Sequence, residues 1–448
     1  MRIRSLFLTL AVGALAASAL PATAVPEYRS SDNLSLVAHL AGCGGSDLEF
    51  FSRELRTYKT IDGTEITIPD EEPPVTRHFA MVGNRSASCT PAGPMTGGAK
   101  IVDITAPETP FIAGRVLNCV PDQGDIQVRS DGMIATIAKQ GGSCSVNGSP
   151  VGHGSIVVDL SDVYNPRAIS IATQGAPNAK GAHNNTISPN GKYVYISESG
   201  DSPGRIPIID ISNPAQPRFV KNFEFGDGGN SPHDIRFSDD GKRAYAAGIN
   251  RMRILNTEDL ENPTLISSIQ VPGSQIGHDI LVTPDKSFLF FGEETNGGST
   301  APCPGGGIYV YDIRGAKEAN PELIGYSLIG NGPVTNRRFD EALVGTQGGC
   351  TSHVMDMNPN KKSFTIGWYV SGLATFDFSS MYNADGTPKA MPKGVFFGPN
   401  GVGEGLVETG YMIPDGANTW AAKQYHRVPG YIFADDINLG FYVTKILP

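Results

Sequence analysis

Short apolar runs that end in an acidic or amide residue recur along the chain, and a proline follows each of them. In four copies the acidic or amide residue lies seven positions before the proline: Ile101–Pro110, Val157–Pro166, Ile208–Pro217 and Ile254–Pro263. Two longer versions follow, at Val310–Pro321 and Thr375–Pro388. Successive acidic or amide positions are 46 to 65 residues apart. A repeat of this length, made of short strands, is typical of an array of β-sheet blades.

A second repeated unit lies between these runs and reads as strand, tight turn, strand. Its copies are Ala182–Ser197, Pro232–Ala247, Gly277–Gly292 and Ser352–Gly367, with a weaker one at Gly124–Ala138. Each blade therefore has four strands: two from this hairpin, one from the apolar run, and one after the proline. The second and third strands are almost continuously apolar, which predicts sheets covered on both faces. The proline fits an edge strand, and the acidic residue before it can bind the backbone of the next turn.

The expected fold is an all-β propeller of seven four-stranded antiparallel blades. The last blade lacks an outer strand, and the N-terminal segment 33–40 resembles the missing one. Closure of the ring by this segment would remove exposed sheet edges. We therefore expect residues 25–448 to form one propeller domain. Six or eight blades stay open as alternatives, because the first and last units are the least regular.

Residues 1–24 predict a secretory signal peptide rather than part of the fold. Arg2 and Arg4 precede the apolar run Leu6–Leu20, and Ala22-Thr23-Ala24 is a small-residue cleavage site. No later apolar run is long enough to predict a transmembrane segment. We expect a secreted or cell-envelope protein. The net charge of −10 and the lack of basic blocks argue against nucleic acid as a partner.

Six cysteines in an exported chain favour disulfide bonds, and the absence of a C-x-x-C pair argues against a cysteine zinc site. Six cysteines allow 15 connectivities. The pairing we expect joins loops at the edges of blades: Cys43–Cys89, Cys119–Cys144 and Cys303–Cys350.

Four histidines, His183, His233, His278 and His353, begin the first strand of four successive blades. The first strand of a propeller blade lines the central channel, so we expect these imidazoles around one channel mouth. The matching positions elsewhere are expected at Asp47, Asp125 and Trp420, and the residues directly after the first three histidines are Asn184, Asp234 and Asp279.

Two interpretations of the histidines compete. Converging neutral imidazoles suit copper, zinc or iron, with neighbouring carboxylates as supporting groups. Alternatively, a residue repeated in several blades serves the fold of each blade, and this structural role is slightly favoured. If a ligand binds at this mouth, we expect it to contact Asp125, Asp234, Asp279, Glu293, Arg337, Arg338 and Trp420.

Some of these candidates do not repeat between blades. Glu293 and Glu294 follow the second strand of the fifth blade, and Arg337 and Arg338 occupy the loop before His353. The two arginines could hold an anionic ligand. The favoured alternative is a solvated loop with weak ion pairs.

The segments IVDI, VVDL and IIDI, each followed by proline, resemble the LVIVD repeat of exported bacterial β-propellers. This resemblance covers most of Ala99–Pro388 and implies the propeller fold, with little about activity. The segment PHDIRFSDDGKRAYAA more weakly resembles blades of the selenium-binding protein and methanethiol oxidase family, which implies histidine-bound copper.

The function we expect is that of a binding or interaction module. Its loop face and channel mouth would bind a protein, a glycan or a small molecule. The alternative is a metal-dependent oxidoreductase of the copper type on the ring of histidines, and a lyase or hydrolase rests on fold analogy alone. The sequence contains no G-x-S-x-G, H-E-x-x-H or G-x-x-x-x-G-K-[ST] motif.

Overall fold

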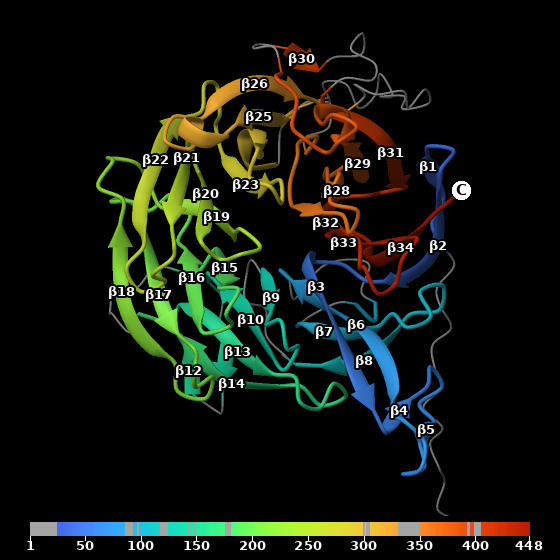
Figure 1. The fold of residues 1–448 in the computed structure, drawn as a ribbon. Coiled ribbons are helices and arrows are strands. Elements are labelled where there is room, and N and C mark those ends of the chain that lie inside the picture. Colours follow the sequence, from blue (N-terminus) through green and yellow to red (C-terminus); the bar gives the residue numbers. More distant parts are fainter. Residues whose placement is uncertain are drawn as a thin grey trace, which may run out of the picture.

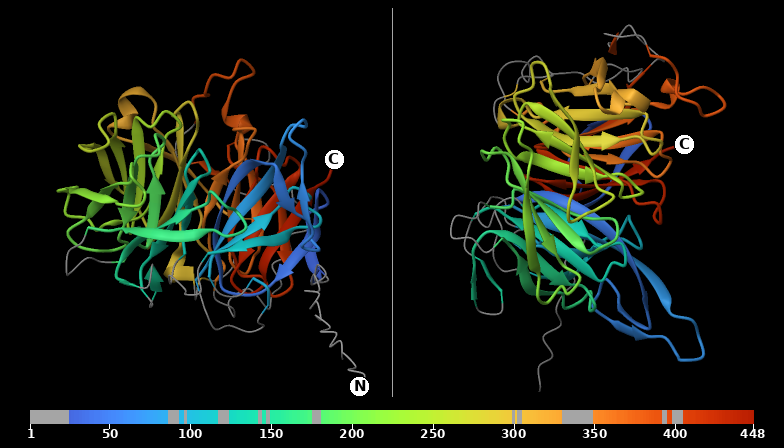
Figure 2. Two further views of the ribbon diagram at one scale, coloured as in Figure 1. Left: turned by 90° about the horizontal axis from the view of Figure 1, so that it is seen from below. Right: turned by 60° about the vertical axis from the view of Figure 1, so that its left-hand side comes forward.

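The computed structural model is a ring of seven antiparallel sheets around a central axis (Figure 1). It describes residues 25–85, 93–95, 98–116, 124–141, 144–146, 149–174, 181–298, 301, 305–329, 349–391, 395–397 and 405–448. Viewed from the side, the ring is a flat disc with loops on both faces (Figure 2). Helical structure in the described residues is limited to three 3-10 turns: η1 (Thr295–Gly298), η2 (Gly315–Glu318) and η3 (Ser379–Met381).

Each blade contains four strands that follow one another in the sheet, from the channel to the rim. The first blade consists of β3 (Gly45–Leu55), β6 (Val75–Asn84), β7 (Lys100–Asp103) and β8 (Phe111–Arg115). The second consists of β9 (Ile126–Val128), β10 (Ile134–Lys139), β13 (Gly154–Asp159) and β14 (Arg167–Ala172). The third consists of β15 (Asn184–Ile187), β16 (Tyr193–Ser197), β17 (Arg205–Asp210) and β18 (Arg218–Glu224). The fourth consists of β19 (Pro232–Phe237), β20 (Arg243–Gly248), β21 (Arg251–Asn256) and β22 (Thr264–Gln270).

The last three blades follow the same order. The fifth consists of β23 (Gly277–Val282), β24 (Phe288–Glu293), β25 (Ile308–Asp312) and β26 (Glu322–Ser327). The sixth consists of β27 (Met355–Met357), β28 (Ser363–Gly367), β29 (Leu373–Asp377) and β31 (Val407–Pro414). The seventh consists of β32 (Thr419–Lys423), β33 (Tyr431–Asp436), β34 (Gly440–Ile446) and β2 (Leu34–Ala41).

The N-terminal strand closes the ring. β2 pairs antiparallel with β34, with Leu34 opposite Ile446 and Ala41 opposite Gly440. Leu34 and Leu36 are buried against Met412 of the neighbouring blade and against the seventh blade itself. The predicted fold class is therefore confirmed: seven four-stranded blades, closed by the N-terminal strand.

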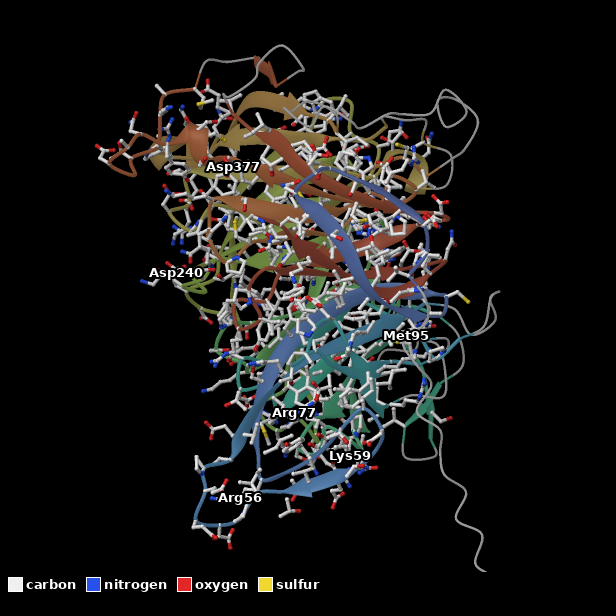
Figure 3. All side chains as sticks on the ribbon, turned by 90° about the vertical axis from the view of Figure 1, so that its right-hand side faces the viewer. Arg56, Lys59, Arg77, Met95, Asp240 and Asp377 are labelled. Atoms are coloured by element: carbon white, nitrogen blue, oxygen red, sulfur yellow. The ribbon has the colours of Figure 1, made fainter. Side chains whose placement is uncertain are left out.

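Four short additions extend this ring and were not predicted. β1 (Tyr28–Ser30) extends the sixth blade beside β31, and β30 (Val395–Phe397) lies parallel to β26 at the rim of the fifth. The hairpin of β4 (Thr57–Lys59) and β5 (Glu65–Thr67) extends away from the first blade, where Figure 3 labels Arg56 and Lys59. β11 (Cys144–Val146) and β12 (Ser149–Val151) form a hairpin in the second.

The acidic or amide residue that ends each third strand fixes the turn after it, as predicted. Asp159 Oδ1 accepts the Ser161 backbone N–H at 2.8 Å, and Asp210 accepts that of Ser212 at 2.8 Å. The same bond recurs for Asp103, Asn256, Asp312 and Asp377. The recurring side chain is therefore explained by turn geometry.

Apolar side chains from neighbouring blades form the core. Phe290 of the fifth blade and Phe364 of the sixth have ring centroids 5.3 Å apart, and Tyr195 and Phe237 join the third and fourth blades at 5.0 Å. Blades covered on both faces need the continuous apolar strands seen in the sequence.

No described cysteine is a free thiol. Cys89, Cys119 and Cys303 lie outside the described residues, so the pairing Cys43–Cys89, Cys119–Cys144 and Cys303–Cys350 stays a prediction. The signal peptide at 1–24 also lies outside them. Across the described part of the chain, no helix has the length and apolar character needed to cross a membrane.

Candidate functional site

Two of the channel-lining strands carry a local irregularity at their histidine. The pairing of β19 with β20 shifts register between Pro232 and Asp234, and the pairing of β23 with β24 shifts between Gly277 and Asp279. Such a bulge sets two residues opposite one, which changes the direction of the bulged side chain. As a result, a histidine and the acidic residue after it both reach the channel, at two different levels.

The four predicted histidines lie side by side at one channel mouth. The ring centroids of His183 and His233 are 4.1 Å apart, those of His233 and His278 4.1 Å, and those of His278 and His353 3.7 Å. Trp420 continues the arc, 3.9 Å from His353. The structure thus brings all four histidines and Trp420 together around a cavity of about 230 Å³.

Hydrogen bonds to Nδ1 hold two of the four imidazoles in place. In three of the four, one ring nitrogen has no hydrogen-bond partner among the described residues. His183 Nδ1 lies 2.9 Å from Gln140 Oε1, and His353 Nδ1 lies 2.9 Å from the Trp420 carbonyl oxygen. A carbonyl only accepts, so His353 Nδ1 carries the hydrogen and Nε2 holds the lone pair. Within the described residues, His353 Nε2, His233 Nδ1 and His278 Nδ1 are buried and have no hydrogen-bond partner.

Burial keeps these imidazoles neutral. It lowers the pKa of His183 to about 4, with a further contribution from Arg85, and it lowers the pKa values of His233, His278 and His353 well below the usual value. Neutral imidazole is the form that binds metal ions. The site therefore has the protonation state that a metal ligand needs near neutral pH.

A second set of side chains surrounds the histidines, and the sequence analysis missed most of it. These residues follow the second strand of the first six blades at one equivalent register position: Arg85, Gln140, Ser199, Ile249, Glu294 and Tyr369. All except Gln140 line the same cavity, and Gln140 contacts His183. The aligned hairpin repeats stop two residues before these positions. A longer alignment would have found them.

Glu294 is the carboxylate nearest the histidines. Its Oε1 accepts the Tyr369 hydroxyl at 2.5 Å and lies 3.9 Å from His353 Nε2. Burial raises the pKa of Glu294 to about 7, against the opposing effects of Tyr369 and Arg85. The carboxylate and the imidazole lone pair thus face each other across a gap that a cation would fill.

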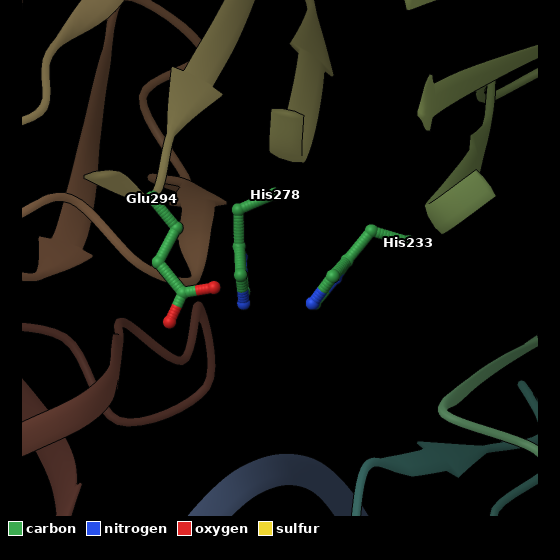
Figure 4. A group of neighbouring side chains, drawn as sticks. All are labelled: His233, His278 and Glu294. Carbon is green, nitrogen blue, oxygen red and sulfur yellow. The ribbon is translucent and has the colours of Figure 1, made fainter. Parts of the chain in front are cut away.

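Three ligand atoms, one each from His233, His278 and Glu294, lie within 4.8 Å of one another, and all three residues are buried. Figure 4 shows the two imidazoles side by side and the carboxylate directed toward them. Two nitrogens and one carboxylate oxygen suit a first-row transition metal such as zinc or copper.

The expected equivalence of Asp47 and Asp125 with the histidines is wrong. Asp125 Oδ2 accepts the Asn185 backbone N–H at 2.8 Å, and Asp279 Oδ2 accepts the Met355 backbone N–H at 2.6 Å. Each carboxylate thus accepts the backbone N–H of the residue that lies two positions after the histidine of the next blade. Asp125 therefore corresponds to Asp279, the residue after His278, and Gly124 takes the place of the histidine.

These acidic residues belong to a separate charged layer on the far side of the histidines. Arg236 binds Asp279 through two hydrogen bonds of 3.0 Å each, and Lys423 lies 2.9 Å from Asp47. Asp234 lies in the same layer, where burial and Asp279 raise its pKa to about 8. The predicted site residues are thus divided between two ends of the channel.

The remaining candidates lie apart from the histidines. Glu293 accepts the Ser274 hydroxyl at 2.5 Å and the Gln275 backbone N–H at 2.7 Å, which anchors that loop. It does not line the histidine cavity. Arg337 and Arg338 lie outside the described residues.

Comparison with protein families gives one match. The model of the LVIVD repeat matches residues 183–224, which form the third blade from His183 to the end of β18. This chain carries an LVIVD repeat. The resemblance drawn from IVDI, VVDL and IIDI is thereby confirmed, and the LVIVD segment IIDI is the third strand of its blade, β17. No curated protein matches the chain.

Several solved structures are similar in fold to this chain. Hydrazine synthase from Kuenenia stuttgartiensis has a TM-score of 0.50 and 14% identity, over 81% of this chain and 91% of that one. The C-terminal WD40 domain of Sif2 has a TM-score of 0.50 and 9% identity, over 93% and 99%. The periplasmic gluconolactonase PpgL of Pseudomonas aeruginosa has a TM-score of 0.47 and 12% identity, over 75% and 85%. At these identities the likeness concerns the fold alone.

Proposed function

We propose that this propeller binds a transition-metal ion at the histidine-lined mouth of its channel, with His233, His278 and Glu294 as ligands. The observation that carries the proposal is the convergence of these three ligand atoms within 4.8 Å. Burial keeps both imidazoles neutral, which is the form that binds a metal ion, and this supports the proposal.

His353 is the candidate for a fourth ligand. Its Nδ1 hydrogen is held by the Trp420 carbonyl oxygen, which leaves the Nε2 lone pair directed to the side of Glu294. This arrangement, in which one ring nitrogen donates to a backbone carbonyl, is the usual way that proteins orient a metal-binding imidazole. Zinc and copper bonds to nitrogen and oxygen are about 2.0–2.2 Å, so donors around a tetrahedral ion lie about 3.5 Å apart, and side-chain rotations would close the site.

Metal content and metal binding together test the proposal. Protein purified without a histidine tag is analysed by elemental mass spectrometry and then titrated calorimetrically with Zn²⁺ and Cu²⁺. One ion per chain is expected, with affinity at least tenfold weaker in His233→Ala and in His278→Ala. His426→Ala, which changes an exposed histidine, is the matched control and should bind like the parent chain.

The opposite result has a definite meaning. If the parent chain binds neither ion and its thermal stability ignores them, the metal proposal is wrong, because a ligand that binds only the folded state must raise stability. The histidines would then have a structural role. An interaction module with a protein, glycan or small-molecule partner would remain.

A metal-dependent oxidoreductase is the second candidate, and one observation favours it. The cavity beside the three ligand atoms has a volume of about 230 Å³, and Arg85 and Tyr369 line it. A catalytic metal site keeps such room for a substrate, whereas a structural site is closed. Copper, when bound, would supply one-electron chemistry. A Cu²⁺ electron paramagnetic resonance signal that ascorbate removes and air restores would support this function, and a signal that ascorbate leaves unchanged would oppose it.

Export is part of the proposed function. The signal-like segment 1–24 supports a secreted or cell-envelope location. N-terminal sequencing of the protein recovered from cell fractions should find a mature chain that begins near Val25, in the secreted or envelope fraction. Peptide mapping without reduction tests the three disulfide pairs, which the oxidising compartment would permit.

A further inference from the structure

A second cavity lies on the other side of the channel, among the charged layer. It has a volume of about 270 Å³ and is lined by channel residues, among them Asp125, Asp234, Arg236 and Lys423, and by turn residues such as Ser238. It shares no lining residue with the histidine cavity. The two channel ends therefore present two separate chemical surfaces.

The cations of this cavity already have carboxylate partners. Lys423 lies 2.9 Å from Asp47 and 2.7 Å from Glu49, and Arg236 is held by Asp279. Each positive charge is thus compensated by protein groups, so the lining has no free cation to attract an anionic ligand.

Two carboxylates have no direct ion pair. Asp125 and Asp234 are 9% and 8% exposed, line the cavity, and form no ion pair with any described residue. Lys423 and Arg236 act on them only at longer range. Asp125 uses Oδ2 to bind Asn185, and Asp234 uses Oδ1 to accept the Ile235 backbone N–H at 2.7 Å. Within the described structure, no protein donor contacts the other oxygen of either carboxylate. Burial raises the pKa of both carboxyls, that of Asp234 to about 8, and a positively charged ligand between them would favour their ionised forms.

The rest of the lining favours an organic cation over a bare metal ion. Ile187, Ile235, Phe237 and Val354 also line the cavity. These apolar side chains offer no ligand to a metal, but they suit the alkyl or aromatic part of a small molecule. The volume of about 270 Å³ is also far larger than one ion needs.

We propose that this end of the channel is a binding site for a small organic amine, whose ammonium group lies between Asp125 and Asp234 and whose apolar part contacts the partly exposed Ile187 and Phe237. The site does not depend on the metal proposal, because it uses different residues at the other end of the channel.

Calorimetry with n-butylamine in phosphate buffer, which contains no competing amine, tests this site. We expect saturable binding of one molecule per chain, no binding of the neutral analogue n-butanol, and affinity at least tenfold weaker in Asp125→Asn and Asp234→Asn. Asp239→Asn is the matched control, since the Asp239 side chain at the cavity rim is 72% exposed and pairs with Lys361. His278→Ala should bind butylamine like the parent chain.

Two results would overturn the proposal: equal binding of butylamine and butanol, or butylamine binding that both asparagine variants leave unchanged. Binding of Mg²⁺ or Ca²⁺ with no binding of the amine would also overturn it. Crystals soaked in 4-bromobenzylamine give a measurement that needs no variant. A bromine anomalous peak beside Ile187 and Phe237 is expected, and its absence at an amine concentration that saturates the protein in solution would count against the site.

Discussion

The Lys423 ammonium of the last blade lies 2.9 Å from Asp47 Oδ1 of the first blade. The seam at which the ring closes is therefore joined twice: at the rim by the pairing of β2 with β34, and at the channel by this ion pair. Glu49 contacts the same ammonium at 2.7 Å. Both ends of the chain thus contribute to one closed ring.

Replacing Lys423 should destabilise the fold strongly. Lys423→Met leaves Asp47 and Glu49 without their cation, and breaking a buried ion pair in this way costs about 3–5 kcal/mol. Burial alone would lower the pKa of Lys423, but Asp47 and Glu49 raise it above the usual value, so the ammonium and its contribution are fully present at neutral pH. Urea unfolding at pH 7 measures the effect.

The control for this prediction is Lys445→Met, which removes a pair with the half-exposed Glu108 at 2.8 Å. An exposed pair is worth about 1 kcal/mol or less. Equal losses in the two variants would contradict the assigned role of the Lys423 seam.

The N-terminal strand should contribute core stability and not merely cover an edge. Leu36 of β2 is buried with Met412 of the sixth blade and Ala434 of the seventh. Leu36→Ala should lower the free energy of unfolding by about 2–5 kcal/mol, because it leaves a cavity between two blades. Phe219→Ala, at a partly exposed position on β18, should cost less than Leu36→Ala, under about 1 kcal/mol. If Leu36→Ala lowered the free energy of unfolding by no more than the control does, the packing of β2 would not be needed to keep the ring closed.

The stability of the fold at acidic pH should depend on Asp312. Burial alone would raise the pKa of Asp312, but hydrogen bonds from Arg314 and Lys317 lower it to about 2. A carboxyl whose pKa is lower in the folded state stabilises the fold above its unfolded pKa, near 4, and loses this contribution as pH falls toward 2. Asp312→Asn should therefore lose less stability than the parent chain between pH 4 and pH 2. Parallel curves for the two proteins would refute this assignment.

The hydroxyl of Tyr369 should position Glu294 for metal binding. Tyr369→Phe removes the 2.5 Å hydrogen bond to Glu294 Oε1 but keeps the ring beside His353. Loss of such a supporting contact typically weakens metal affinity about 10–100-fold. Glu294→Gln should weaken it at least as much, since it changes the ligand itself. Calorimetric titration with Zn²⁺ gives both values, and an unchanged affinity in both variants would exclude Glu294 as a ligand.

The repeats predicted the blades well because strand period, turn residues and the acidic residue before each proline all obey local rules. Ring closure by β2 also followed, since β34 would otherwise leave an exposed edge. The additional strands β1 and β30 were missed: they are three residues long, and the pairing that makes them strands is with residues distant in the sequence.

The site was predicted only in part. The four histidines share one position in their hairpins, so the sequence places them together. Asp125 was assigned to the wrong level because nothing local shows whether Gly124 or Asp125 is the counterpart of a histidine, and only the contact of Asp125 with the next blade decides it. Glu294 and Tyr369 share no chemistry, and only the strand register shows that they are equivalent.

The central claim is that His233, His278 and Glu294 bind one metal ion. The most direct measurement is the anomalous diffraction of crystals of the untagged mature protein soaked in Zn²⁺, with data collected on both sides of the zinc edge. We predict a single strong anomalous peak about 2.0–2.2 Å from a nitrogen of each of these histidines and from a Glu294 oxygen. Fully soaked crystals with no peak among these three side chains would contradict the account.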